Sequence, residues 1–224
     1  MTEAEQERTL WFGMAKQIAH QMGTPLSAIM GWLELLPTAK DPVQVAAEIN
    51  QNLDRLKYLL ERLNQIGPPT RFETFSPGEI VREVRAYFES RLPSGSSSIE
   101  IRDELGGEYF IHANRWLLSW ALENLVKNSV DALQEKGGSI TISLSAKESQ
   151  VIIEVSDQGS GIAEQDQAFI FQPGFTTRRG AYGTGLSLAR YIIEEVHGGK
   201  LLLKESLAGS GTTMRIVLKA ASKK

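Results

Sequence analysis

The sequence predicts an α+β protein: an N-terminal helical hairpin that forms a dimeric four-helix bundle, followed by an α/β sandwich domain. Two observations favour this fold. Apolar residues recur at heptad spacing through the first third of the 224-residue chain, a pattern typical of bundle-forming helices. After a Gly-Pro-Pro stretch at residues 67–69, helical segments alternate with β-branched runs. We therefore expect two domains, residues 1–68 and residues 69–224.

The N-terminal hairpin is predicted from two apolar stripes separated by prolines. A second helix follows the break at Pro37, Asp41 and Pro42 and ends before Gly67. Two helices alone leave wide apolar faces uncovered, so we expect a homodimer in which two hairpins pair. The first stripe comprises Ala15, Ile18, Met22, Ile29, Trp32 and Leu36, widened by Ala19, Leu26 and Leu33; the second comprises Ile49, Leu53, Leu56, Leu60 and Leu63.

The second domain is predicted from the changed periodicity after about Phe72. Its expected helices span residues 77–91, 114–133 and 184–195, and its expected strands are the runs SITISLS, VIIEVSD, GKLLLKE and TTMRIVLK. The Pro-, Ser- and Gly-rich residues 93–98 are expected to form a loop within this domain.

The composition is that of a folded chain without a broad charge bias. Hydrophobic residues make up 42% of the chain, enough to bury a core. Since 24 Lys and Arg residues face 27 Asp and Glu, we expect no nucleic acid partner. The absence of cysteine excludes disulfides and Cys-ligated zinc, so any metal should prefer oxygen ligands.

The N-terminal sequence lacks the features of a secretory or membrane protein. No stretch approaches the roughly 18 consecutive apolar residues of a membrane span. The acidic start MTEAEQER lacks the basic region of a signal peptide. We therefore expect a cytoplasmic chain that itself makes no membrane contact, whether alone or as the cytosolic part of a larger or membrane-bound protein.

His20 is the histidine whose neighbourhood indicates chemistry. It lies on the face of the first predicted helix opposite the apolar seam. Thr24 places a hydroxyl one helical turn later, and Pro25 removes a backbone donor and bends the helix. A solvated surface histidine is the simpler interpretation of position alone, and the bend beside it favours an accessible, functional one.

Three further segments carry polar or glycine-rich patterns suited to a phosphate ligand. Asn124, Asn128 and Asp131 share one helical face, where amide oxygens can hold Mg²⁺. Asp157 ends a predicted strand and precedes Gly159-Ser160-Gly161-Ile162, so its carboxylate can accept from an exocyclic amine such as that of adenine. The glycine-rich residues 180–185 open onto a helix that starts near Leu186, where backbone N–H groups can meet phosphate. Each pattern also fits an ordinary polar face or turn when taken alone.

Taken together and in this order, the segments resemble the two-component histidine kinases over essentially the whole chain. His20 with Thr24 and Pro25 resembles the phospho-acceptor box, and residues 124–132 resemble the N box. Residues 157–162 and 183–186 are similar to the two glycine boxes, residues 169–175 to the F box, and residues 209–213 to the closing Gly-Thr segment.

The resemblance implies that residues 1–68 are the dimerisation and phospho-acceptor domain and that residues 69–224 are a Bergerat-type ATP-binding domain. Such a protein uses Mg-ATP to phosphorylate His20, transfers the phosphoryl group to an aspartate of a response regulator, and could also dephosphorylate that regulator. Residues 172–182 are expected to form a mobile lid. The implied catalytic residues are His20, Gln21, Thr24 and Asn124; the implied metal ligand is Asn128; and the implied nucleotide-binding residues are Asn128, Lys127, Asp131, Asp157, Gly159, Gly161, Ile162, Phe171, Thr176, Thr177, Arg178, Tyr182, Gly183, Thr184, Gly185, Leu186 and Thr213.

Two alternatives remain at this point, an ATPase of the same superfamily and an ATP-binding dimeric pseudokinase scaffold. Hydrolytic relatives place a glutamate four residues before the metal-binding asparagine, whereas this chain has Asn124 there, and an amide cannot act as the base. The chain also departs from many kinases of the family at Gln21, where a carboxylate usually follows the phospho-acceptor histidine. His112 and His197 are interpreted as structural, with His197 at a helix end.

Overall fold

The structure is a computed structural model that forms two compact units, Met1–Thr70 and Arg71–Lys224. It describes residues 19, 22–23, 25–38, 41–64, 72–92, 99–134, 136–177, 183 and 185–222.

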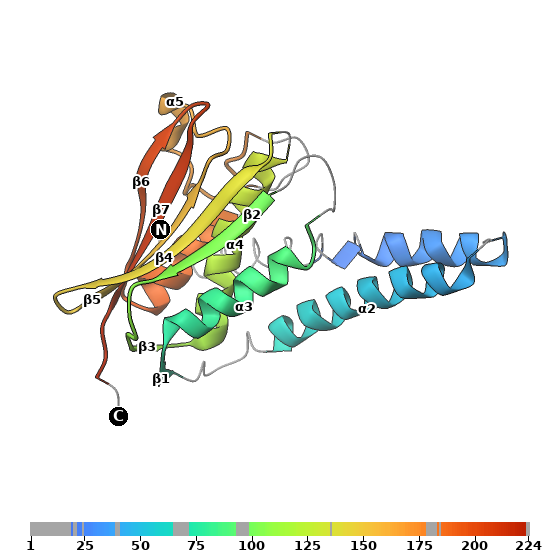
Figure 1. The fold of residues 1–224 in the computed structure, drawn as a ribbon, viewed down its shortest axis with the longest axis horizontal. Helices are drawn as coiled ribbons and strands as arrows, with labels where there is room; N and C mark the ends of the chain where they lie inside the picture. The colour runs from blue at the N-terminus through green and yellow to red at the C-terminus, as the bar shows by residue number, and fades with distance from the viewer. Residues whose placement is uncertain are drawn as a thin grey trace. The chain divides into compact units, whose positions relative to one another are not determined.

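The first unit is a helical hairpin, which confirms the predicted architecture. Residues 25–35 are helical and lead into the 3₁₀ turn η1 (Leu36–Thr38), and the chain returns as α2 (Pro42–Asn64), which runs alongside the first helix (Figure 1). The start of α2 follows from its sequence, because Asp41 Oδ1 accepts from the N–H groups of Val43 and Gln44, each at 3.0 Å, and Pro42 needs no donor partner in the first turn.

The hairpin leaves much of its predicted apolar surface uncovered within one chain. Ile29 and Val45 are buried, at 9% and 5% exposed. Large apolar side chains that remain exposed are Leu26, Met30, Leu33, Leu35, Leu36, Val43, Leu53 and Leu60. Exposed leucines at seam positions of both helices are what an unpaired bundle half would show.

The second unit is a mixed five-stranded sheet with helices, accompanied by a small two-stranded sheet. The strand order is β2-β4-β5-β7-β6, in which β2 and β4 are parallel and the other pairs antiparallel, while β1 pairs antiparallel with β3. The elements in chain order are β1 (Glu73–Phe75), α3 (Pro77–Glu89), β2 (Ile99–Leu105), β3 (Ile111–Ala113), α4 (Arg115–Leu133), β4 (Gly138–Lys147), β5 (Gln150–Asp157), α5 (Glu164–Gln167), α6 (Gly185–Tyr191), the π-helical segment η2 (Ile192–Val196), β6 (Lys200–Leu207) and β7 (Gly211–Lys219).

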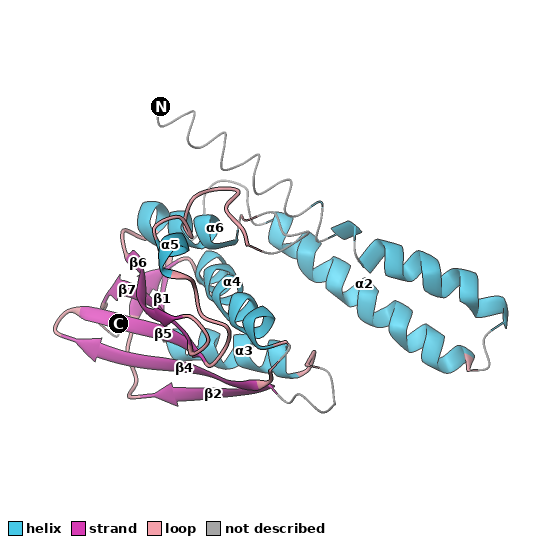
Figure 2. Ribbon diagram, turned by 90° about the horizontal axis from the view of Figure 1, so that it is seen from above, coloured by secondary structure: helices cyan, strands magenta, loops and turns pink. Residues whose placement is uncertain are grey.

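Helices α3, α4 and α6 cover one face of the large sheet, and the core lies between these two layers (Figure 2). The strands alternate accordingly, with every second side chain directed toward the helices. The fully buried core includes Leu118, Leu122 and Leu125 of α4, Ile140, Ile142 and Leu144 of β4, and Val151, Ile153 and Val155 of β5. This two-layer arrangement confirms the α+β fold class.

The four predicted strands are present, and the sequence pattern missed β1, β2, β3 and α5. Strand β2 has the sequence IEIRDEL, whose charged residues mask the alternation expected of a strand. They are tolerated because β2 is an edge strand, which pairs on one side only and exposes polar side chains to water. Strands β1 and β3 have three residues each, too few to show a period. Within the described parts of the chain, no helix has both the length and the apolar character needed to span a membrane.

Candidate functional site

Asp157 lies at the end of β5 with its carboxylate on the helix-covered face. It is 8% exposed, and its Oδ2 accepts from Ser129 Oγ of α4 at 2.9 Å while Oδ1 accepts from the Gly159 N–H at 2.9 Å. The alternation of β5 that buries Val155 also turns Asp157 inward. Each carboxylate oxygen offers two lone pairs, so these bonds leave capacity to accept from a ligand amine.

Ser129 is a candidate site residue that the sequence pattern did not indicate. It is 3% exposed and continues the inward row of α4 formed by Leu118, Leu122 and Leu125. The helical period places an apolar side chain at position 129, so a hydroxyl there indicates a buried polar contact. Its partner, 28 residues away, could not be named from the pattern.

The loop after β5 packs tightly against the C-terminal end of α4. A Cβ added at Gly159 would lie 2.6 Å from Ala132 Cβ and 2.9 Å from its carbonyl oxygen, so only glycine fits. The Ser160 N–H donates to the same carbonyl at 3.2 Å, Gly161 has a φ of 68°, and the Ile162 N–H donates to Ser206 Oγ at 2.8 Å. The two glycines therefore hold this loop against the protein itself and place Asp157 at its edge.

Strand pairing places Thr212, rather than Thr213, on the same face as Asp157. The β5–β7 register pairs Asp157 with Thr212 and Ser156 with Thr213. Thr213 Oγ1 lies 2.9 Å from Ser156 Oγ, on the opposite face of the sheet, whereas Thr212 Oγ1 lies 2.9 Å from Ser206 Oγ. The resemblance of residues 209–213 to the closing Gly-Thr segment implies Thr213, and a run of two threonines does not say which one faces inward. The role of Thr213 in nucleotide binding stays a prediction.

Helix α4 carries the predicted asparagines. Asn124 is 6% exposed, its Nδ2 donates to the Trp120 carbonyl at 2.9 Å, and its Oδ1 lies 3.2 Å from where a Cβ of Gly185 would be. Asn128 is half-buried one turn further along. Lys127 is exposed and forms an ion pair with Asp131 at 3.4 Å. Along α4 the polar side chains thus change from the buried amide of Asn124 to the exposed ion pair of Lys127 and Asp131.

The segment between α5 and α6 brings the F-box residues and the start of α6 together. Gly185, the first residue of α6, faces Asn124, and Leu186 follows half-buried. The Phe171 ring lies 5.3 Å from the Arg190 guanidinium. The Gly174 N–H donates to the Gly183 carbonyl at 3.0 Å, and Thr176 and Thr177 are exposed.

Several predicted site residues lie outside the described part of the chain. They are His20, Gln21, Thr24, Arg178, Tyr182 and Thr184. Their roles stay predictions.

The donor set on α4 fits a cation held mainly by a ligand's phosphates. Among the described residues, no group of three or more histidine, aspartate or glutamate side chains gathers to hold a metal alone. Mg²⁺ commonly uses one or two protein oxygens together with phosphates and water. The half-buried Asn128 amide is suited to that partial role.

An inward carboxylate at the end of β5, asparagines on the facing helix and glycine-rich connections define the second unit as an ATP-binding domain. The family model described as "Histidine kinase-, DNA gyrase B-, and HSP90-like ATPase" matches residues 114–222. The model described as "His Kinase A (phospho-acceptor) domain" matches residues 13–68.

Relatives and solved structures agree with these matches. Sporulation kinase C of Bacillus subtilis is 27% identical over 97% of this chain and 51% of its own length. Sensor histidine kinase ZraS of Salmonella typhimurium is 31% identical over 92% of this chain and 45% of its own length. The catalytic domain of histidine kinase ThkA is 31% identical, with a TM-score of 0.59, and the match covers 66% of this chain and 95% of that domain. The chain belongs to the sensor histidine kinase family, as a phospho-acceptor domain followed by an ATPase domain.

The chain spans about half the length, or less, of the curated relatives it matches. ThkA has also been solved in complex with the response regulator protein TrrA; this structure is 26% identical to the chain and has a TM-score of 0.61. That match covers 98% of this chain and 64% of the solved one.

Proposed function

We propose that this chain binds Mg-ATP, phosphorylates its own His20 and passes the phosphoryl group to an aspartate of a response regulator. The observation that carries the proposal is the buried Asp157, held by Ser129 of α4 and by the Gly159 N–H in the domain matched by the ATPase model. The match of the phospho-acceptor model to residues 13–68, which contain His20, supports His20 as the residue that is phosphorylated.

Asp157 would recognise adenine by accepting from its exocyclic amine. A buried carboxylate rejects guanine, which presents a carbonyl oxygen at the corresponding position and would leave two acceptors facing each other. Thr212 lies beside Asp157 in the register and supports this role. Gly159 keeps the loop close to α4, and its N–H bond to Oδ1 holds the carboxylate in place.

The phosphates would lie along α4 toward Asn128 and Lys127. Asn128 would hold Mg²⁺, which neutralises phosphate charge when it is bound. Lys127 is exposed and would exchange its ion pair with Asp131 for contact with a phosphate. Asn124, whose amide already donates to the Trp120 carbonyl, is neutral and cannot activate water, so the site would keep ATP intact until a nucleophile arrives.

Phosphoryl transfer requires an unprotonated imidazole nitrogen on His20. That nitrogen would form a bond to the γ-phosphorus as the bond to the leaving ADP oxygen breaks, and the proton of the ring would pass to a base or to water. Gln21 can hold the ring by a hydrogen bond but cannot accept that proton near neutral pH. Thr24, one turn away, would position the ring.

Transfer to a response regulator and pairing with a second copy complete the proposal. The complex of ThkA with the response regulator TrrA supports a receiver-domain partner. The exposed leucines of the hairpin, among them Leu26, Leu33, Leu53 and Leu60, support a homodimer, because a second hairpin would bury them. Residues 172–182 would form the lid that closes over the nucleotide.

The deciding experiment is incubation of the chain with radiolabelled Mg-ATP, followed by acid and base treatment of the product. We expect label that is acid-labile and base-stable, as for a phosphoramidate, and that disappears in His20→Gln. Steady phosphate release without labelled protein would indicate an ATPase instead. Nucleotide binding without either product would indicate a pseudokinase scaffold. Label that persists in His20→Gln would refute His20 as the acceptor.

A further inference from the structure

His197 forms hydrogen bonds to two helices through both nitrogens of its ring. It follows η2 directly, is half-buried, and its Nδ1 lies 2.7 Å from the Ile192 carbonyl oxygen. A carbonyl only accepts, so Nδ1 donates. The Nε2 atom accepts from the Asn114 N–H at 3.0 Å. These two bonds require a neutral ring with its proton on Nδ1.

The π-helical turn of η2 makes this arrangement possible. The His197 N–H donates to the Ile192 carbonyl at 3.2 Å, so the carbonyl accepts from both the backbone and the side chain of the same residue. A π turn widens the helix by one residue and is common where a helix serves a functional purpose. In η2 the π turn places the Ile192 carbonyl oxygen within reach of His197 Nδ1, and this bond keeps the ring proton on Nδ1.

The bond from Asn114 to His197 satisfies a donor that the helix itself cannot satisfy. Asn114 is the N-cap of α4 and is 7% exposed, and its side chain accepts from the Leu117 N–H at 2.9 Å. Its own N–H precedes the helical ladder and has no acceptor within α4. A buried N–H without an acceptor is costly, so the bond to His197 favours the position of Asn114 beside the end of η2.

Helix α4 and the α6–η2 helix pack antiparallel, and polar contacts lie at both ends of the α6–η2 helix. At one end His197 binds Asn114, and at the other Asn124 lies against Gly185. The ten residue steps from Asn114 to Asn124 span about 15 Å of helix. The bond between His197 and Asn114 therefore joins the two helices at the end that lies farther from the proposed nucleotide site.

We propose that His197 is a positioning residue for nucleotide binding: by accepting from Asn114, it sets the register of α4 against α6–η2 and so places Asn124 and Asn128. This inference rests on the proposed nucleotide-binding role of α4. His197 contacts no reacting group, and its effect passes through the helix.

The surroundings of His197 favour the neutral ring. Burial is the main cause that lowers the pKa of His197 below 6.5, and it outweighs the bond to the Ile192 carbonyl, which favours the protonated ring. The Asn114 N–H donates to Nε2 and so also favours the neutral ring. The Phe72 ring lies 5.3 Å from the imidazole and 5.8 Å from the ring of His112 on β3.

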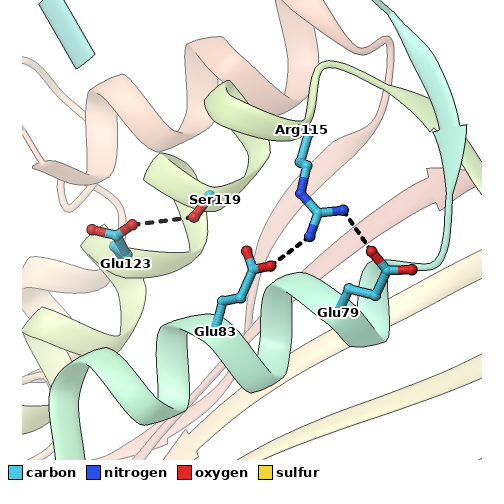
Figure 3. A network of polar contacts seen from close by, with 5 residues as sticks. All are labelled: Glu79, Glu83, Arg115, Ser119 and Glu123. Carbon is cyan, nitrogen blue, oxygen red and sulfur yellow. Dashed lines mark hydrogen bonds and ion pairs between the residues drawn. The ribbon is translucent and has the colours of Figure 1, made fainter. Parts of the chain in front are cut away.

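The charged groups on the neighbouring elements are either exposed or bound elsewhere. Glu194 of η2 accepts from Arg190 and from the Leu201 N–H, and Arg115 of α4 binds Glu79 and Glu83 of α3 (Figure 3). Glu195, Glu73 of β1 and Lys200 of β6 are exposed.

Substitution of Arg115 is a matched control, because it also removes side-chain bonds at the start of α4 but leaves the bond between His197 and Asn114 in place. Arg115 follows Asn114, and its guanidinium binds Glu79 at 2.7 Å and Glu83 at 2.6 Å, which ties the same helix end to α3 instead of η2 (Figure 3). Arg115→Gln should therefore lower stability without changing the register between α4 and α6–η2.

The test measures binding of Mg²⁺ and a non-hydrolysable ATP analogue to the full chain by calorimetry. We expect His197→Leu to raise the Kd about tenfold. Without the imidazole, the Asn114 N–H must find another acceptor, which shifts α4 against α6–η2, and nucleotide binding must then reverse that shift. His197→Gln keeps an acceptor in place of Nε2 and should stay within about threefold of the native chain, and Arg115→Gln within about twofold. An unchanged Kd in folded His197→Leu, or an equal loss in His197→Gln, would overturn the inference.

A second measurement covers the case in which His197→Leu does not fold. Long-range ¹H–¹⁵N correlation spectra of the native chain at pH 7.5 should show a neutral His197 with the proton on Nδ1, and a proton on Nε2 would refute the proposed link. If the native chain itself does not bind the analogue, the proposed nucleotide-binding function fails, and the tautomer spectrum still tests the link from His197 to Asn114.

Discussion

Replacing Asp157 by asparagine removes one charge while keeping the size and hydrogen-bonding capacity of the side chain. The amide oxygen can still accept from the Gly159 N–H, at 2.9 Å in the native chain. The amide nitrogen takes the place of Oδ2 and can donate to Ser129 Oγ, because a hydroxyl both donates and accepts. We therefore expect the fold to be retained, and the change to fall on the ligand.

The expected loss follows from the bond that Asp157 would make to adenine. A hydrogen bond to a buried charged acceptor contributes about 1.5–3 kcal/mol. At 8% exposure Asp157 is poorly screened by water, so a value of about 2 kcal/mol is reasonable, equivalent to an approximately 30-fold rise in Kd for ATP.

The assay compares ATP with the triphosphate of purine riboside, which lacks the 6-amino group. The native chain should bind ATP more tightly than the analogue, and Asp157→Asn should bind the two about equally, because the lost bond involves that amine. Ser156→Ala is a suitable control, since Ser156 is adjacent in sequence but bonds to Thr213 on the opposite face of the sheet. Equal losses for both nucleotides would show that Asp157 shapes the loop and does not recognise adenine.

Three further predictions test other parts of the site. Asn128→Ala should raise the Mg²⁺ concentration needed for nucleotide binding and abolish labelling of His20, and an unaltered Mg²⁺ dependence in a binding titration would remove Asn128 from the metal. Gln21→Glu should speed autophosphorylation at pH 7, because a carboxylate can accept the imidazole proton; single-turnover rates from pH 6 to 9 that coincide with the native profile would contradict this. The lowered pKa of His197 means that its contribution to the free energy of unfolding is fully present above pH 6.5 and is lost as the pH falls toward the folded-state pKa, because the unfolded chain binds the proton first. Urea unfolding from pH 5 to 8 should show a weaker loss on acidification in His197→Gln than in the native chain, and parallel curves would exclude His197 as the source.

The sequence alone determined the fold class and the segments that carry the site. The heptad seam of the first unit and the periods of α4, β4, β5 and β7 are strong because each element buries one continuous face. Asp157, Asn124 and Asn128 could be selected because their segments follow one another in the order that resembles the histidine kinases, whereas each pattern alone also fits an ordinary polar face or turn.

Tertiary structure alone decided which residues accompany them. The choice of Thr212 over Thr213 depends on the β5–β7 register, and the partnership of Ser129 with Asp157 joins residues 28 positions apart. His197 reads as an ordinary helix end in the sequence, and its bond to Asn114 spans 83 positions. Such contacts arise when distant elements pack together, and a local period carries no information about which distant neighbour an element will meet.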